Sequence, residues 1–346
     1  MGAGEGYTRR EFLRMSGRAG AGLALLSSVP YFLNGSAIAP EACVTRAQYL
    51  MGTVVTITAY GESRAHANEA ISRAFDEMRR VDEMMSLYKP ESDVSRLNRA
   101  AGREAIGVDS SVIEIIEHAR SFTLATEGTF DISIEPLMEL WGFRSQQSPH
   151  EMPTDTQIRN ALETVGMKHV VVECAAQRAG LLNRHARIDL GGIAVGYSVD
   201  RAVEALRRAG VERAFINHSG DAYALGAPPE RDGWEIGIPD PSCPSEMIAT
   251  FRLHDRAAST SGNYEKYVTI DDSRVGHILD PHTGRPGRAL LSATLLAPTA
   301  LEADALSTGL FCKELNALQE AVKRSNCLEV FAVTEDNEQV SIRSTG

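Results

Sequence analysis

The sequence predicts a single α+β domain, with a largely antiparallel or mixed sheet as its core and helices packed around it. Segments typical of strands and of helices alternate irregularly, and several strands read as antiparallel pairs rather than as a doubly wound sheet. The 346 residues are 43% hydrophobic and include 29 Gly and 14 Pro, the composition of a globular protein. About 300 residues remain after an N-terminal leader, and we expect residues 40–346 to form the domain.

The leader, residues 1–39, reads as an export signal. Arg9 and Arg10 precede Phe-Leu, a weakly apolar run follows, and residues 37–39 have the A-x-A pattern of a cleavage site. We interpret this segment as a twin-arginine signal peptide and expect a periplasmic protein. An N-terminal membrane anchor is the alternative, but the apolar run is short and rich in Gly and Ser.

The charge of the chain argues against a nucleic-acid partner. The whole chain carries a formal charge of −11, and its leader contributes +2, so the mature chain carries −13. It has no block of Lys and Arg to seat on anionic lipid. The five cysteines are scattered without a CxxC pair, which predicts no zinc site and leaves at least one thiol unpaired.

Local patterns place the elements in chain order. A run rich in β-branched residues predicts a strand over 54–60, and apolar residues at three- and four-residue spacing predict a helix over 63–85. A second helix is expected over 111–125 and a third over 155–165, after a polar stretch at 145–155 that reads as a surface insertion. Strands are expected around 169–173 and 186–190.

Residues 187–200, RIDLGGIAVGYSVD, predict a strand that ends at Gly191-Gly192 and feeds a helix. Glycines there let a ligand approach the backbone, and the helix start suits a phosphate group. The spacing matches neither a dinucleotide fingerprint nor a Walker loop, and a plain connector is the commoner meaning of such a turn.

A helix that begins near residue 302 carries Asp304 and Thr308 four residues apart, so their oxygens share one face. A carboxylate and a hydroxyl are hard ligands that suit Mg²⁺. Solvated polar groups on a capped helix are the alternative. Small polar residues at 217–221 and 260–264 stand at apparent strand ends, where turn chemistry alone explains them.

The stretch GHILDPHTG, residues 276–284, predicts a strand end followed by a tight turn, because Pro fixes φ and Gly tolerates positive φ. His277 and Asp280 lie at the lip of that turn. Either one polar side chain of a hairpin faces water, or both side chains face a ligand.

These motifs together resemble the ApbE family of FAD:protein FMN transferases. The resemblance runs from about Met51 to Cys312 and rests on MGT (51–53), MSLYKPESDVSRLN (85–98), GTFDISIEPLMELWGF (128–143), IDLGGIAVGYSVD, SG-Y, HILDP-TG and ADALSTGLF. It implies transfer of FMN from FAD to a threonine or serine hydroxyl of a partner protein, with Mg²⁺ required and AMP released.

The resemblance also assigns roles to single positions. It implies that FAD is enclosed by Met51, Tyr88, Thr129, Phe130, Asp131, Asp189, Val195 and Ile278. The magnesium site is implied at the Gly192 carbonyl and the side chains of Asp304 and Thr308, with Ser307 beside them. His277 matches the histidine that assists deprotonation of the acceptor hydroxyl.

The chain departs from the family pattern at two places. Val195 stands where most members have Lys, which removes a cation near the cofactor, and Ser219 stands where Gly is common. The leader and the valine are similar to the NosX branch, which implies a membrane-associated or periplasmic acceptor flavoprotein such as a NosR-like subunit. Two other functions fit the same motifs: hydrolysis of FAD to FMN and AMP by a pyrophosphatase, and a periplasmic carrier that binds FAD without converting it.

Overall fold

Eight strands form the main sheet of the computed structural model, which describes residues 42–145, 151–243, 245–264, 266–271, 273–324, 329–334, 336 and 338–343. The strand order is β1-β2-β6-β7-β10-β15-β16-β17, and every neighbouring pair is antiparallel. The strands are β1 (Ala42–Leu50), β2 (Thr53–Gly61), β6 (Arg213–His218), β7 (Asp221–Leu225), β10 (Arg256–Gly262), β15 (Leu290–Ala297), β16 (Glu329–Thr334) and β17 (Gln339–Arg343). The predicted signal peptide lies outside the described residues.

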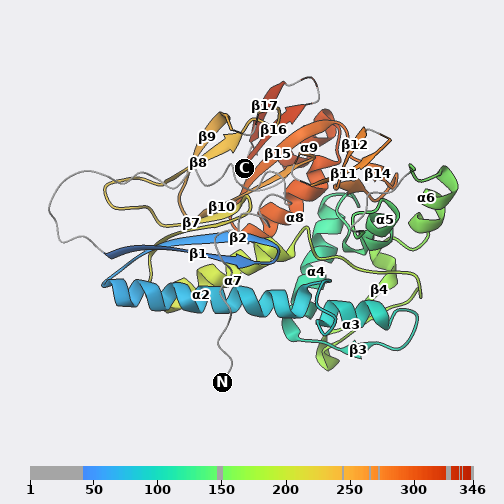
Figure 1. The fold of residues 1–346 in the computed structure, drawn as a ribbon, viewed down its shortest axis with the longest axis horizontal. Coiled ribbons are helices and arrows are strands. Elements are labelled where there is room, and N and C mark those ends of the chain that lie inside the picture. The colour runs from blue at the N-terminus through green and yellow to red at the C-terminus, as the bar shows by residue number, and fades with distance from the viewer. Residues whose placement is uncertain are drawn as a thin grey trace.

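Helices cover one face of this sheet. The long helix α2 (Arg64–Met85) lies along the β1–β2 pair, next to α7 (Ala194–Arg208), and α8 (Ala300–Phe311) packs on β10 and β15 (Figure 1). α9 (Leu315–Arg324) follows against β16 and β17. The main hydrophobic core lies between these helices and the sheet, and it includes Phe75, Leu206 and Phe311. Burial of this apolar area is what holds the two layers together.

The opposite face of the sheet carries a hairpin of β8 (Trp234–Pro239) and β9 (Met247–Leu253). Trp234 stacks on Phe215 of β6 with ring centroids 5.4 Å apart, and Ile238 packs with Phe331 of β16. Because side chains alternate along a strand, β6 and β10 send every second residue to each layer. The sheet therefore separates the hairpin side from the helix side.

Smaller elements complete the domain beyond the ends of α2 and α7. A three-stranded sheet, β3 (Ile106–Gly107), β5 (Arg178–Leu181) and β4 (Val170–Glu173), packs with α3 (Asp93–Arg99) and α4 (Ser110–Ala125) around a second core. Short helices and hairpins surround a third: α5 (Glu135–Leu140), α6 (Asp155–Leu162), β11 (Tyr267–Ile270), β12 (Ser273–Gly276), β13 (Leu279–Asp280) and β14 (Arg285–Pro286). In the part of the chain that the structure describes, the 3₁₀ turns are η2 (Ile132–Ile134), η3 (Met167–His169) and η4 (Cys174–Ala176).

The predicted strand over 186–190 is wrong, although the other predicted elements are present within a few residues. The backbone of Ile188 is hydrogen-bonded by a side chain instead of by a neighbouring strand. Asn98 accepts a hydrogen bond from the Ile188 N–H and donates one to the Ile188 carbonyl, each 2.8 Å long. The segment therefore satisfies its backbone without joining a sheet, and the strand that precedes it, β5, was not predicted.

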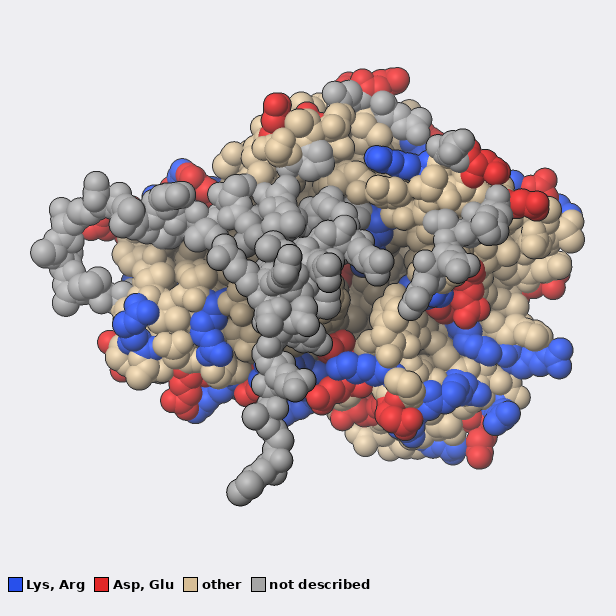
Figure 2. Space-filling model, viewed as in Figure 1, with Lys and Arg blue, Asp and Glu red and all other residues tan. Residues whose placement is uncertain are grey.

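Among the described residues, no helix combines the length and the apolar character that a membrane crossing needs. The four described cysteines, Cys43, Cys174, Cys243 and Cys312, form no disulfide, and Cys327 lies outside the described residues. Acidic and basic side chains are interspersed over the face in Figure 2. The surface insertion predicted at 145–155 falls partly outside the described residues.

Candidate functional site

A close contact between α7 and α8 builds one side of the candidate site. A Cβ on Gly196 would lie 2.2 Å from the carbonyl oxygen of Ala300, so only glycine fits. This approach lets the Gly196 N–H donate to Asp304 Oδ2 at 2.9 Å. Asp200 joins the same helices, because its two carboxylate oxygens accept the N–H groups of Ala300 and Leu301 at 2.8 and 2.9 Å. The position of Asp304 is therefore fixed by backbone contacts.

Two carboxylates lie close together at this place. Burial, followed by the charge of Asp221, raises the pKa of Asp304 well above its ordinary value. Burial also raises the pKa of Asp221 to about 7. The ammonium of Lys266 acts on both carboxyl groups in the opposite direction. Carboxylates that share a poorly solvated site favour a bound cation or a proton.

Thr308 brings a hydroxyl to the same face of α8. It follows Asp304 by one helical turn, and a Cβ on Gly192 would lie 3.3 Å from Thr308 Oγ1. The same Cβ would lie 3.5 Å from the ring of Phe130. The double-glycine turn thus stands directly against the polar face of α8.

The Ser307 side chain points toward the sheet, away from the face of α8 that carries Thr308. Its hydroxyl donates to the Asp304 carbonyl at 3.1 Å and lies 3.0 and 2.9 Å from the hydroxyls of Ser259 and Ser261 on β10. These contacts join α8 to the sheet. Ser307 therefore supports the site from beneath, with its hydroxyl engaged inside the protein.

The residues present fit a magnesium ion. No group of three or more His, Cys, Asp and Glu side chains that could hold a metal occurs among the described residues. The candidate donors are instead the Asp304 carboxylate, the Thr308 hydroxyl and the Gly192 carbonyl, all hard oxygen ligands. Mg²⁺ takes few protein oxygens when water and phosphate oxygens complete its octahedron.

His277 lies just after β12, where the β11–β12 hairpin fixes its tautomer. The Lys266 carbonyl accepts two hydrogen bonds from this residue, one from the backbone N–H and one from Nδ1, both 3.1 Å long. A carbonyl only accepts, so Nδ1 carries the proton and Nε2 keeps a free lone pair. Burial lowers the pKa of His277 to about 4, and the Lys266 ammonium acts in the same direction.

The turn after His277 has the geometry that its sequence predicts. Gly284 has φ +66°, and its N–H donates to the Asp280 carbonyl at 2.8 Å. Asp280 Oδ1 accepts the His282 N–H and Oδ2 accepts the Thr283 hydroxyl, at 2.9 and 3.1 Å. The Asp280 carboxylate therefore shapes the turn, while the neighbouring Ile278 side chain is buried in the main core.

Asp189 connects His277 to the glycine turn. Its Oδ1 accepts the Gly191 N–H at 2.7 Å, and its negative charge offsets part of the lowering of the His277 pKa that burial and Lys266 cause. The guanidinium of Arg144 donates to its other oxygen and to the hydroxyl of Tyr88. Tyr88 is 77% exposed, so its ring stands open to a ligand.

The run from 129 to 131 is buried and folded on itself. The Thr129 hydroxyl donates to the Thr126 carbonyl at 2.9 Å. Asp131 accepts from the N–H and hydroxyl of Ser133, at 2.8 and 2.6 Å, and from the Met167 N–H at 3.1 Å. The side chains of Thr129 and Asp131 hold the backbone of this turn in place.

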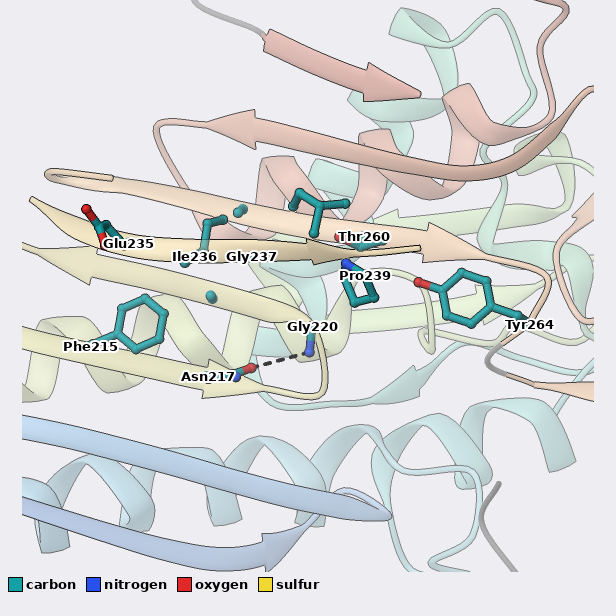
Figure 3. Close-up of a pocket in the computed structure, with 12 residues that line it drawn as sticks. Phe215, Asn217, Gly220, Glu235, Ile236, Gly237, Pro239, Thr260 and Tyr264 are labelled. Carbon is teal, nitrogen blue, oxygen red and sulfur yellow. Dashed lines mark hydrogen bonds between the residues drawn. The ribbon is translucent and has the colours of Figure 1, made fainter. Parts of the chain in front are cut away.

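A pocket on the opposite side of the sheet is separate from these residues. Strands β6, β7 and β10 form its floor, β8 forms one wall, and Tyr264 lies at one end (Figure 3). Thr260 faces this pocket, whereas its neighbours Ser259 and Ser261 face α8. The sheet therefore separates the pocket from the oxygen ligands described above.

Comparison with known proteins decides the family. The model of the ApbE family matches residues 51–332. The chain belongs to the ApbE family. It is 30% identical to the FAD:protein FMN transferase of Salmonella typhimurium over 328 residues, 91% of this chain and 93% of that protein. The match with the Haemophilus influenzae protein of the same name is also 30% identical and covers 82% of each chain.

Solved ApbE structures share the fold. The crystal structure of the ApbE protein of Thermotoga maritima has a TM-score of 0.81 and 30% identity, covering 88% of this chain and 97% of that one. Flavin transferase ApbE from Vibrio cholerae has a TM-score of 0.79 and 26% identity, covering 88% and 98%.

The structure brings several of the ApbE motif residues together. Tyr88 and Asp189 meet at Arg144, and Gly192 lies between Phe130 and Thr308. Met51 lies in the β1–β2 turn with φ +48°. That turn is joined to the next one by a hydrogen bond of 3.1 Å between the hydroxyls of Thr53 and Ser219. The assigned roles of these residues stay predictions.

Sequence reasoning missed three charged residues at the site: Glu135, Arg144 and Lys266. Glu135 begins the short helix α5 and Arg144 follows that helix, and Arg144 joins Glu135 to Asp189 only in the folded chain. Lys266 reaches the site through a hairpin, and its charge acts on both Asp304 and His277. A lone lysine in a hairpin gives no pattern in the sequence.

Proposed function

We propose that this ApbE-family protein transfers FMN from FAD to a threonine or serine hydroxyl of a partner protein and releases AMP. The observation that carries the proposal is the unprotonated Nε2 of His277, which the charge of Asp189 influences, while Asp189 is bonded to the double-glycine turn that stands against Thr308 of α8. Relatives named FAD:protein FMN transferase support it over most of their length.

The reaction balances as a displacement at the phosphorus nearer the riboflavin. The acceptor oxygen forms a new bond to that phosphorus, the bond to the bridging oxygen breaks, and AMP leaves with that oxygen. Nε2 of His277 takes the proton of the acceptor hydroxyl. The double-glycine turn offers close backbone approach to the diphosphate, and Tyr88 offers a ring to the flavin or the adenine.

Mg²⁺ belongs to the same proposal. Asp304, Thr308 and the Gly192 carbonyl would hold it, and it would supply positive charge to the diphosphate and the leaving phosphate. Val195 lies in the first turn of α7 and brings no charge there. We therefore expect FAD to bind more weakly than it would with a lysine at this position.

Location and acceptor are also proposals. The twin-arginine pattern at Arg9 and Arg10 supports a periplasmic protein, which acts there on a membrane-associated or periplasmic flavoprotein such as one of the NosR type. Substituting both arginines with Lys should leave the protein in the cytoplasm, as cell fractionation would reveal. Full periplasmic accumulation of the double variant would exclude a twin-arginine signal.

One experiment separates transfer from its rivals. The protein is mixed with FAD and Mg²⁺, with and without a candidate acceptor encoded near its own gene, and AMP is followed. Transfer predicts that AMP forms only with acceptor. Equal AMP in both mixtures would mean hydrolysis, and bound FAD that yields no AMP in either would mean a carrier.

A further inference from the structure

Three segments of the chain meet at the guanidinium of Arg144. Nε donates to the two carboxylate oxygens of Glu135 at 2.8 and 2.9 Å, and Nη2 donates to Glu135 Oε2 at 2.5 Å and to Asp189 Oδ2. Nη1 lies 3.4 Å from the hydroxyl of Tyr88. Glu135 belongs to α5, Asp189 precedes the glycine turn, and Tyr88 follows α2. We name Glu135, Arg144 and Asp189 the arginine cluster.

The arginine cluster is shielded from water. The side chains of Arg144, Glu135 and Asp189 are 21%, 7% and 15% exposed. An ordinary surface pair such as Arg73–Glu69 on α2 is 59% and 65% exposed. Solvent and salt weaken charge-assisted hydrogen bonds much less in a shielded place. The cluster therefore restrains its members more strongly than a surface ion pair does.

Asp189 is restrained from two sides. Arg144 holds Oδ2, and the Gly191 N–H donates to Oδ1 at 2.7 Å. The Asp189 N–H itself donates to the Ile132 carbonyl at 2.7 Å. Without the guanidinium, the carboxylate can rotate away from Gly191, and the turn loses the bond that sets its shape.

We propose that Arg144 is a positioning residue for flavin transfer, which holds Asp189 so that the double-glycine turn keeps its place against α8. This inference rests on the proposed function, because the turn is where the diphosphate of FAD is expected. Among the described residues, Arg144 donates to Glu135, Asp189 and Tyr88, and of these only Asp189 is bonded to the glycine turn, so Arg144 acts on that turn through Asp189.

The pH dependence of the transfer rate gives a readout that a purely structural role of Arg144 would not change. The charged groups that act on His277 are Lys266, Asp189 and Arg144: Asp189 raises its pKa, whereas Lys266 and Arg144 lower it. Removal of the guanidinium leaves the Asp189 charge uncompensated. The fall of the transfer rate at low pH, which we call the acid limb, should then occur at a higher pH.

The test compares Arg144→Met with Arg73→Met, the same change at a surface pair. FAD affinity is measured by fluorescence titration without acceptor, and the transfer rate is measured against pH. Arg144→Met should weaken FAD binding at least tenfold and move the acid limb upward, while Arg73→Met stays within twofold of wild type. Arg144→Lys should restore the wild-type pH dependence but only part of the FAD affinity. Lysine keeps the positive charge but lacks the planar guanidinium that donates to two carboxylates at once.

A double-mutant cycle on FAD affinity tests the route through Asp189. In an Asp189→Asn background, Arg144→Met should change affinity less than threefold. A tenfold loss in both backgrounds, or wild-type affinity and pH profile in Arg144→Met, would overturn the inference.

If Arg144→Met fails to fold, the Glu135→Gln/Arg144→Met variant removes the buried charge and is measured instead. Since the titration needs no acceptor, a wild type that binds FAD and transfers nothing would contradict the proposed function alone.

Discussion

At the scale of single residues, His277 combines a fixed tautomer with a pKa of about 4, below the ordinary value of about 6.5. A base with this pKa stays unprotonated through mildly acidic solution, so the transfer rate should hold to about pH 5 and fall near pH 4. His277→Ala should lose about 10²–10⁴-fold in rate and lose this limb. Single-turnover rates against pH measure both.

FAD binding by the His277→Ala variant is the control, since the imidazole is not placed as a ligand of FAD. A wild-type fall in rate near pH 6.5 would contradict the lowered pKa of the imidazole. A variant that keeps the wild-type rate and pH profile would exclude His277 as the base.

The buried charge of Asp304 should lower the stability of the protein when no metal is bound. Its carboxylate lies buried beside Asp221, an arrangement that destabilises the metal-free protein. Asp304→Asn should therefore melt at a higher temperature than wild type at pH 8 without Mg²⁺, and Mg²⁺ should no longer raise its melting temperature. Flavin transfer should be lost. If added Mg²⁺ stabilises both proteins equally, the ion binds elsewhere.

At the scale of elements, periodicity and turn chemistry predicted α2, α4, α7 and α8 because those signals lie in neighbouring residues. They failed at 186–190, where the side chain of Asn98, about ninety positions away in the chain, pairs the backbone of Ile188. The motif positions Gly192, Asp304 and Thr308 could be predicted as a group from the resemblance. The arginine cluster could not, because a contact between Arg144 and Asp189 has no local pattern.

The contact between α7 and α8 yields a prediction about Gly196. A methyl group there would overlap the Ala300 carbonyl at 2.2 Å and the Asp304 side chain at 2.8 Å. Gly196→Ala should lower the free energy of unfolding by about 3 kcal/mol and weaken Mg²⁺ binding, because the helices must separate. Gly107→Ala, where a Cβ meets nothing within 4 Å, is the control. Equal urea midpoints for the two variants would contradict the close contact.

At the scale of the whole molecule, the antiparallel sheet supports the site at one end and buries His218 beneath it. Burial lowers the pKa of His218 to about 4. The unfolded chain takes up a proton near pH 6.5 and the native protein does not, so this stability is complete above pH 6.5 and is lost as the pH falls toward 4. By pH 5 the loss is about 2 kcal/mol.

His218→Gln removes this proton uptake. The difference in unfolding free energy between wild type and variant should shrink by that amount from pH 7 to pH 5, because the buried carboxyl groups, which titrate in the opposite sense, are common to both. Urea denaturation at each pH provides the measurement. A difference that stays constant with pH would mean that His218 titrates normally.

The proposed covalent transfer is tested most directly by the intact mass of an acceptor protein after incubation with FAD and Mg²⁺. The predicted result is a gain equal to FMN minus one water on a single threonine or serine, present with wild type and absent with Asp304→Asn. An acceptor of unchanged mass, while FAD is bound or split into FMN and AMP, would contradict flavin transfer by this protein.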